Sequence, residues 1–265
     1  MPKHNRWVAF VFSMGICFLY APLGYLVIQA FLTSPDHWQS GFTLQWILKM
    51  LHEPRLLEPL QNSLAIGASA ATLSTLLGTL GAVGFRDLPQ KGHKQPFLVN
   101  ALIVLPVVVP EVITGISLLL FFLFLKVPLG FATVVLAHAS FSASFVYFVV
   151  REQLRRLDPL LAEAAADLGA TPTQTFWKIT FPNVIPGLLG GWLLAFTLSF
   201  DDFLISFFTC GARLTTLPLT IYAWMRIGGS PELNALSVLT LAASGVLVGL
   251  LLLTGQSRRW MLRSS

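Results

Sequence analysis

The chain has 265 residues, of which 55% are hydrophobic and only 11% are charged, and its mean hydropathy is +0.73. This composition excludes an ordinary soluble domain, in which about a quarter of the residues are charged. The net charge of +5 does not indicate nucleic-acid binding, because the basic residues lie in short segments beside apolar runs. We therefore predict an all-α, polytopic membrane protein that forms one transmembrane domain over residues 1–265.

Six apolar stretches are long enough to cross a bilayer as helices, which takes about 20 residues each. The first follows Lys3 and Arg6 and resembles a signal peptide, but its apolar run is too long and no small-residue cleavage site follows it. We expect it to be retained. In chain order, the predicted spans are Trp7–Leu32, Ser63–Phe85, Phe97–Leu125, Leu129–Val150, Val184–Thr209 and Leu233–Leu253.

The distribution of basic residues predicts how these spans are oriented. Positive residues accumulate in cytoplasmic loops, and six spans place both termini on the same side. The predicted cytoplasmic segments hold twelve of the 17 Lys and Arg residues, so both termini are expected in the cytoplasm and the loop of residues 33–62 outside. These basic residues are Lys3, Arg6, Arg86, Lys91, Lys94, Arg151, Arg155, Arg156, Lys178, Arg258, Arg259 and Arg263.

Glycines recur inside the spans at spacings that let membrane helices approach closely. We expect some of them to pack within this chain and others against a second membrane subunit. None belongs to a phosphate-binding loop of the pattern G-x-x-x-x-G-K-S/T, which the sequence lacks. The glycines are Gly78, Gly81 and Gly84 in the second span, and the pairs Gly187–Gly191 and Gly245–Gly249.

The third span carries an acidic residue in a sequence that disfavours a straight helix. Pro106 and Pro110 each remove a backbone donor, and Gly115 adds little resistance to bending. We expect a kink at mid-depth, with freed carbonyls beside Glu111, about 21 Å from Phe97 if the helix is counted as straight. Ionisable groups within spans usually line a pathway, so Glu111 is a candidate site residue. A kink that serves packing only, with Glu111 bonded to a neighbouring helix, is the alternative.

The fourth span contains His138 within LAHASFSASF, and no second histidine stands at a metal-ligand spacing from it. We expect a hydrogen-bonded core residue rather than a metal ligand. No serine or cysteine lies in a recognisable nucleophile motif, so enzyme chemistry is not expected in this chain.

A polar helical segment, residues 158–182, separates the fourth and fifth spans. Asp158 and Pro159 are typical of a helix N-cap and first helical residue, and Gly169 is typical of the left-handed residue that ends a helix. The intervening residues are rich in alanine, which would let another protein approach the backbone closely. An ordinary connector helix is the alternative.

A second helix start follows directly. Thr171, Pro172 and Gln174 match a capping box with proline at the first helical position. Phe181–Pro182 is expected to end this helix before the fifth span begins. The segment is therefore predicted to be two short helices that meet at an elbow.

The fifth span contains two adjacent acids, Asp201 and Asp202, toward its outer half. Adjacent helical residues point about 100° apart, so both can face one lumen only where the helix is broken. We expect one of them to line a path and its neighbour to make a structural bond. Phe200, Phe203, Phe207 and Phe208 surround the pair and offer cation–π contacts, although phenylalanines in a span are often merely lipid-facing.

The elbow resembles the cytoplasmic EAA loop of the membrane subunits of ATP-driven importers, whose pattern is Glu-Ala-Ala, then Gly, then Ile-x-x-Pro. Phe181 stands where a leucine is common. PEVITGISLLLFF and SFDDFLISFFTCG resemble the corresponding spans of spermidine/putrescine importer permeases, and similarity of this kind extends over the whole chain. The residues that match the EAA pattern are Glu163, Ala164, Ala165, Gly169, Ile179 and Pro182.

This resemblance implies the type I fold of ABC importer permeases and a complex of two permeases with two ATPases, located in the bacterial inner membrane. An extracytoplasmic binding protein would supply the cargo, a polyamine. The EAA residues would couple the chain to a cytoplasmic ABC ATPase dimer, which would bind ATP and Mg, while this chain would bind no cofactor. Glu163 would be the charged member of that contact, a role compatible with stabilising its own helix dipole. Glu111, Asp201 and Asp202 would line the substrate path.

Three alternatives remain from the sequence. An ABC permease for a different small solute would share the same elbow. An ion-driven secondary transporter would use the acids to carry protons, and a membrane scaffold would use them to hold helices together. Neither of the last two explains the elbow, and no inverted repeat supports a secondary transporter.

Overall fold

The computed structural model describes residues 4–33, 41–85, 97–227, 231–242 and 245. These residues are mainly helical, and their only extended pairing is an isolated antiparallel bridge between Leu32 and Phe42. The chain divides into two compact units, residues 1–56 with 221–265 and residues 57–220. Most of the predicted sixth span lies outside the described residues, as do Lys3, Arg86, Lys91, Lys94, Gly249, Arg258, Arg259 and Arg263.

The first unit contains α1 (His4–Ala30), α2 (Gln45–Leu51) and a helical segment over residues 231–242. None of the apolar window of α1 is buried within the chain. A helix that is hydrophobic on all sides is not stable against water, so this one is suited to lipid or to another membrane helix. Within the same unit, Lys49 Nζ lies 2.7 Å from Glu232 Oε1.

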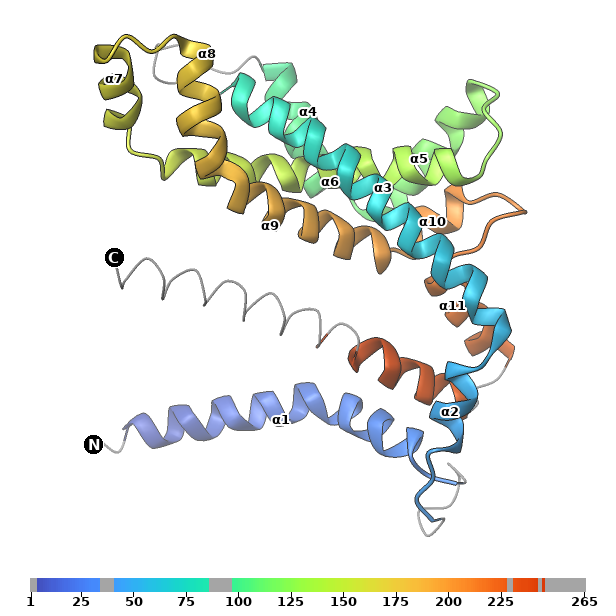
Figure 1. Ribbon diagram of the computed structural model, residues 1–265. Helices are drawn as coiled ribbons and strands as arrows, with labels where there is room; N and C mark the ends of the chain where they lie inside the picture. Colours follow the sequence, from blue (N-terminus) through green and yellow to red (C-terminus); the bar gives the residue numbers. More distant parts are fainter. Residues whose placement is uncertain (1–3, 34–40, 86–96, 228–230, 243–244, 246–265) are drawn as a thin grey trace. The chain divides into compact units, whose positions relative to one another are not determined.

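The second unit holds the remaining helices (Figure 1). Two of them, α3 and α11, cross the boundary between the units. In chain order, the elements of this unit are α3 (Pro54–Gly84), α4 (Phe97–Val108), α5 (Glu111–Phe124), α6 (Phe131–Arg155), α7 (Leu160–Asp167), α8 (Pro172–Thr175), the π-helical turn η1 (Phe176–Thr180), α9 (Phe181–Phe200), α10 (Leu204–Thr209) and α11 (Leu217–Ile227).

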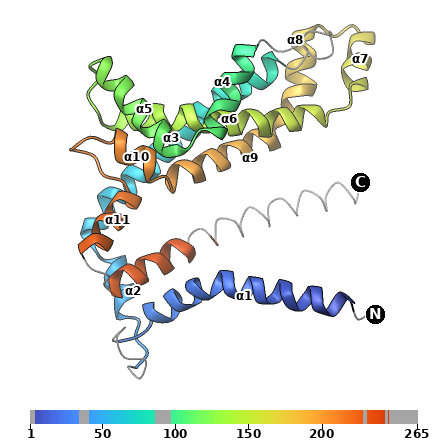
Figure 2. The same cartoon turned by 180° about the vertical axis from the view of Figure 1, so that it is seen from behind.

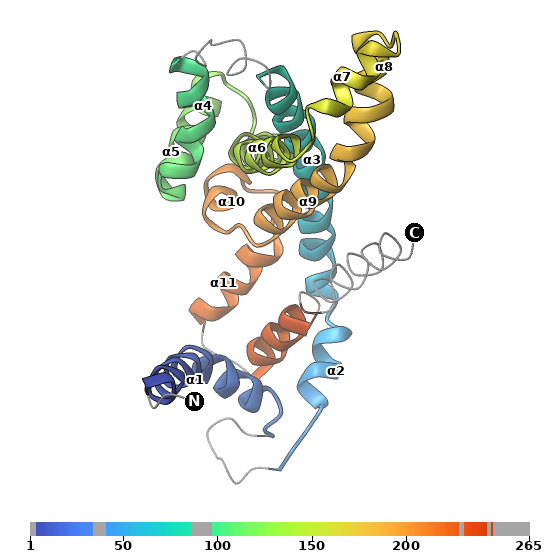
Figure 3. The ribbon, with the colours of Figure 1, turned by 90° about the vertical axis from the view of Figure 1, so that its left-hand side faces the viewer.

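The core of the second unit forms around α6, which Figure 3 shows nearly end-on with α3 and α9 beside it. Glycines permit the close approach. A Cβ on Gly78 of α3 would lie 2.7 Å from the Ala143 carbonyl oxygen of α6, and Cβ atoms on Gly187 and Gly191 of α9 would meet α6 side chains at 2.8 and 3.1 Å. These three glycines therefore serve packing within this chain, as expected for part of the predicted set.

Four described helices are long and apolar enough to span a membrane: Trp7–Ala30, Pro54–Gly84, Phe131–Arg155 and Pro172–Phe200. The predicted third span is two helices instead of one. Phe97–Val108 and Glu111–Phe124 are bent by 117° relative to each other. The expected kink at the prolines is confirmed, but it is far sharper than a bend in one rod. The predicted depth of Glu111 was counted along a straight helix. It is therefore wrong, because α4 ends at Val108 and the chain then turns.

The predicted fifth span is wrong at both ends. Pro182 does not end a helix, since the helix runs without interruption from Pro172 to Phe200. The wider π-helical turn over 176–180 precedes the proline and relieves the clash of its ring with the preceding turn. In addition, Asn183 Nδ2 donates to the Ile179 carbonyl at 2.8 Å. At the other end the helix stops at Phe200, before the predicted end at Thr209.

Candidate functional site

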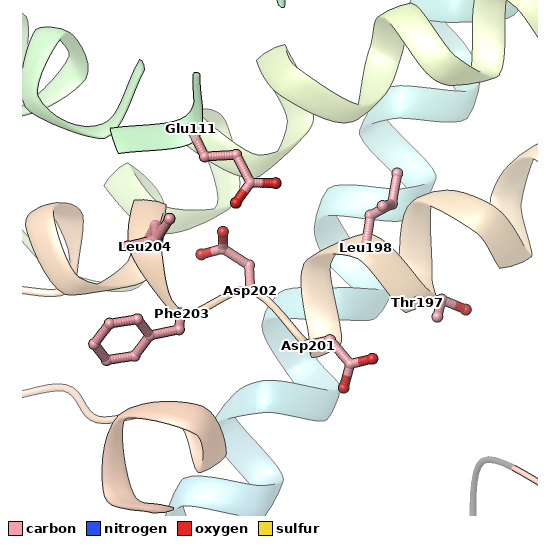
Figure 4. Close-up of a pocket in the computed structure, with 7 residues that line it drawn as sticks. All are labelled: Glu111, Thr197, Leu198, Asp201, Asp202, Phe203 and Leu204. Carbon is pink, nitrogen blue, oxygen red and sulfur yellow. The ribbon is translucent and has the colours of Figure 1, made fainter. Parts of the chain in front are cut away.

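The three predicted intramembrane acids line one pocket of about 300 Å³ in the second unit (Figure 4). Glu111 and Asp201 are 90 positions apart in the chain. The remaining lining residues are Thr197, Leu198, Phe203 and Leu204. Folding therefore brings together negative groups from two spans, which makes the pocket a candidate site for a cation.

Glu111 reaches the pocket because the chain turns sharply just before it. Pro110 has extended backbone angles, φ −57° and ψ 137°, and Glu111 is the first residue of α5. A carboxylate at the N-terminus of a helix interacts favourably with the positive end of the helix dipole. The helix itself lies against α10 (Figure 2), where a Cβ on Gly115 would come within 3.3 Å of the Leu204 carbonyl oxygen. Glycine at position 115 therefore permits the close contact between α5, which begins at Glu111, and α10.

The two aspartates lie where the predicted fifth span breaks, in the non-helical residues between α9 and α10. Asp202 accepts hydrogen bonds from the backbone N–H groups of Ile205 (3.3 Å) and Ser206 (2.7 Å) at the start of α10. His138 Nε2 lies 3.1 Å from its Oδ2. Asp202 is therefore the member of the pair that makes structural bonds.

Asp201 differs from its neighbour in exposure and direction. It is exposed, and its carboxylate points away from Asp202, whereas the carboxylates of Glu111 and Asp202 point toward each other (Figure 4). Glu111 and Asp202 are close enough to interact electrostatically. The break allows both aspartates to border one pocket, a geometry that a continuous helix would forbid.

His138 is a hydrogen-bonded core residue, as predicted, with only 2% of its surface exposed. Its role beside the acidic pocket was not predicted. Its partners Ser199 and Ser206 are 61 and 68 residues away in the chain, and Asp202 lies between the two helices that carry them. No local sequence pattern could have revealed these contacts.

Of the predicted aromatic neighbours, Phe203 lines the pocket. Phe200 is the last of three stacked rings along α9, after Trp192 and Phe196, with centroid separations of 5.5 and 5.8 Å. Phe208 packs against Gly115, while Phe207 is 56% exposed. Only part of this group therefore borders the acids.

The first helix of the predicted elbow is present and is closed by local bonds. Asp158 Oδ1 accepts the N–H of Leu160 at 3.0 Å, and α7 ends at Asp167. Gly169 is left-handed, with φ +81°. The N–H groups of Gly169 and Ala170 donate to the carbonyls of Ala166 and Ala165, both at 2.9 Å, which is the pattern of a Schellman motif.

The second helix start of the elbow is also as predicted. Thr171 Oγ1 accepts the Gln174 N–H at 3.3 Å, Gln174 Oε1 accepts the Thr171 N–H at 2.9 Å, and Pro172 occupies the first helical position. Around this turn, Glu163 is exposed and Leu168 is 89% exposed. The elbow thus presents charged and apolar side chains outward.

Comparison with known proteins identifies the family. Residues 96–260 match the family described as binding-protein-dependent transport system inner membrane components. The chain belongs to this family. It is therefore a membrane transport component, and the pocket and the elbow both lie within the matched region.

Curated relatives cover most of this permease. It is 39% identical over 250 residues to the putrescine transport system permease protein PotI of Escherichia coli K12, covering 91% of this chain and 88% of the relative. It is 37% identical over 233 residues to the spermidine/putrescine transport system permease protein PotC of the same strain, covering 87% of each. The PotC protein of Haemophilus influenzae is 32% identical over 243 residues, covering 91% of this chain and 92% of the relative.

Two solved structures share the fold at low sequence identity. A chain of a bacterial ABC transporter involved in the import of the acidic polysaccharide alginate has a TM-score of 0.66 at 14% identity, covering 97% of this chain and 96% of that chain. A chain of an amino acid ABC transporter crystallised with histidines has a TM-score of 0.59 at 18% identity, covering 82% of this chain and 100% of that chain. This permease thus shares the fold of these ABC transporter chains.

Proposed function

We propose that the chain is a permease subunit of an ABC importer and forms half of the translocation path for a polyamine, or a similar cationic solute. One observation carries this proposal. A single uninterrupted helix, Pro172–Phe200, begins at the elbow and ends at the acidic pocket. At about 1.5 Å per residue it covers roughly 40 Å, enough to link a cytoplasmic partner to a site within the membrane.

The cargo is inferred from the charges around the pocket. A polyamine carries several ammonium groups, and each can pair with a carboxylate. Glu111 and Asp201 have the accessible carboxylates, while Asp202 adds negative charge from a largely hydrogen-bonded position. Phe203 offers an aromatic ring at the same pocket. The names of the relatives PotI and PotC, which specify putrescine and spermidine/putrescine transport, support a cargo of this class.

The coupling mechanism follows from the elbow. A cytoplasmic ABC ATPase dimer, which holds ATP and Mg, would dock against α7 and α8, with Glu163 as the charged contact. The other coupling residues are Ala164, Ala165, Gly169, Ile179 and Pro182. Closure of the ATPases would move the elbow, and the long helix would carry that movement to the pocket, alternating its access between the two sides of the membrane. The chain itself has a transport role and no enzymatic one.

The assembly and topology complete the proposal. We place six spans in one transmembrane domain, including residues 233–253, in the bacterial inner membrane with both termini in the cytoplasm. A second permease, of the same or a different sequence, would form the other half of the path. An extracytoplasmic binding protein would deliver the cargo on the outer side. The fold shared with ABC transporter chains supports this arrangement.

The test is uptake of radiolabelled spermidine into proteoliposomes that contain the purified complex of both permeases and the ATPases, with the binding protein added. Replacing Asp201 with Asn should lower uptake by roughly tenfold, since it removes one charge-assisted contact. The double replacement of Asp201 and Asp202 should lower it further. Assembly, measured by co-purification, should change little. Glu152→Gln, which removes an exposed carboxylate outside the pocket, is the matched control.

Two outcomes contradict the proposal. Equal spermidine uptake by the double variant removes the carboxylate argument. Uptake that persists without the ATPases and collapses with the proton gradient would identify an ion-driven transporter instead.

A further inference from the structure

One imidazole joins three helices at the break that forms the pocket. His138 projects from α6 and contacts both sides of the break. Its Nδ1 lies 2.6 Å from Ser199 Oγ, in the last turn of α9. Its Nε2 lies 3.1 Å from Asp202 Oδ2, before α10, and 3.1 Å from Ser206 Oγ within α10. The His138 side chain is therefore bonded on both edges of the ring.

The acceptor character of a carboxylate specifies which ring nitrogen carries a proton. An ionised Asp202 only accepts hydrogen bonds, so Nε2 of His138 must be protonated to bond with it. Nδ1 then accepts from the Ser199 hydroxyl when the ring is neutral, or donates to it when the ring is charged. In both states, the Nε2–H lies between Asp202 Oδ2 and Ser206 Oγ, each 3.1 Å from Nε2, and α9 is tied to α6 through Ser199.

The contact between His138 and Asp202 is important for stability because both side chains are buried. The side chain of Asp202 is 7% exposed and that of His138 is 2% exposed. Within the described residues, the groups that pair with or donate to the Asp202 carboxylate are the His138 imidazole and the backbone N–H groups of Ile205 and Ser206. A buried carboxylate that loses a donor is destabilised. Because Glu111 faces it across the pocket, Asp202 would also be repelled from its present position.

We propose that His138 is a positioning residue for the cation site: its Nε2–H holds the Asp202 carboxylate beside the pocket, and its Nδ1 holds the end of α9. The inference rests on the proposed function in so far as the cation is the cargo. The imidazole need not touch the cargo, since it acts through Asp202. A residue that only fills space in the core would need neither ring nitrogen.

A matched pair of variants separates these roles. In His138→Gln, the side-chain amide nitrogen reaches approximately the place of Nε2 and can still donate to Asp202. In His138→Asn, the shorter amide reaches approximately the place of Nδ1 and leaves Asp202 without this donor. The assay is spermidine uptake by the complete reconstituted transporter. We expect His138→Asn to lower uptake about tenfold, because it loses one hydrogen bond to a charged group. His138→Gln keeps that bond and should stay within about threefold of the unmodified protein. Co-purification of the complex checks that both variants assemble.

A second measurement does not depend on the cargo. Thr197 is exposed and lines the pocket, so Thr197→Cys introduces a reporter thiol there. Cys17 is replaced by serine, and Cys210 is only 3% exposed. The ratio of modification rates with a cationic and a neutral methanethiosulfonate reagent then reports the negative potential in the pocket. We expect this ratio to fall in Asp202→Asn, to fall similarly in His138→Asn, and to remain unchanged in His138→Gln.

The outcomes distinguish the two proposals. If the unmodified transporter does not take up spermidine but the reagent ratios follow this order, the positioning role stands and the proposed cargo is wrong. If the Gln and Asn variants give the same ratio, or if Asp202→Asn leaves the ratio unchanged, His138 does not position a charge at the pocket. Equal uptake by the two His138 variants likewise overturns the inference.

Discussion

The elbow and the break between α9 and α10 lie at opposite ends of one helix, yet different kinds of interaction determine them. The elbow is closed by bonds between residues no more than five positions apart, such as the pair between Thr171 and Gln174 and the bond from Ala170 to Ala165. The break has local bonds too, from Ile205 and Ser206 to Asp202, but it also depends on other helices, through His138 of α6 and the close contact at Gly115 of α5. Only the first kind is visible in a short stretch of sequence.

This difference suggests that the two ends of the helix respond differently to movement of their surroundings. A locally determined elbow keeps its shape when a partner pulls on it, because its bonds do not depend on the rest of the fold. A break determined by neighbouring helices can instead respond when those helices move. Each end of the helix should then depend on the interactions that hold it.

The largest expected effect is at the elbow, through the proposed charged contact of Glu163 with the ATPase. Glu163→Lys should lower ATP-dependent uptake by roughly tenfold or more, since reversing a charge at an interface removes one pairing and adds a repulsion. Folding should be intact, because Glu163 is exposed. Uptake and ATP hydrolysis are measured together in proteoliposomes, and hydrolysis without uptake is the expected signature.

Glu152→Lys, in an exposed pair with Arg156, is the control and should have little effect. Normal uptake by Glu163→Lys would contradict the assigned role of the elbow.

An intermediate effect is expected at the break. In Gly115→Ala, the new Cβ would lie 2.7 Å from Phe208 Cδ2 and 3.3 Å from the Leu204 carbonyl oxygen, so the Phe208 ring or the two helices must shift. We expect a loss of about 1–3 kcal/mol in stability, measured by thermal unfolding in detergent.

Gly190→Ala is the matched control for this substitution. It also places an alanine in a helix, but its Cβ would meet nothing within 4 Å. Alanine is favoured over glycine in a helix by up to about 1 kcal/mol, so this variant should be neutral or slightly more stable. Similar stability of the two variants would show that the contact between α5 and α10 does not hold the break.

The smallest effect is expected from the turn of the elbow itself. Gly169 has φ +81°, and an alanine there should cost about 1–2 kcal/mol of local stability, because its Cβ is crowded in the left-handed region. Faster hydrogen exchange of the amides in α7 and α8, without a change at α10, is the expected result. Gly169→Asn should exchange almost as slowly as the unmodified chain, since asparagine tolerates this conformation. A change that spreads to α10 would mean that the two ends are not determined independently.

The fold class, the broken third span and the elbow could be predicted from residues close together in the chain. Composition requires a hydrocarbon environment, the two prolines remove backbone donors, and Gly169 and Thr171 carry the signals of helix ends. The fifth span was predicted less well. Pro182 is a local signal for a helix end, but the π-helical turn accommodates it, and tight packing of Gly187 and Gly191 against α6 favours continuation of the helix.

The sequence by itself determined that three acids lie in apolar segments, where an unpaired charge is costly and therefore informative. It also determined that Asp201 and Asp202 need a broken helix if both are to face one space. Only the tertiary structure decided that Glu111 joins them, that Asp202 is the bonded member, and that His138 supplies the bond. The physical reason is distance along the chain: helix caps and turns involve neighbouring residues, whereas the imidazole that pairs with Asp202 comes from a helix far away in the sequence.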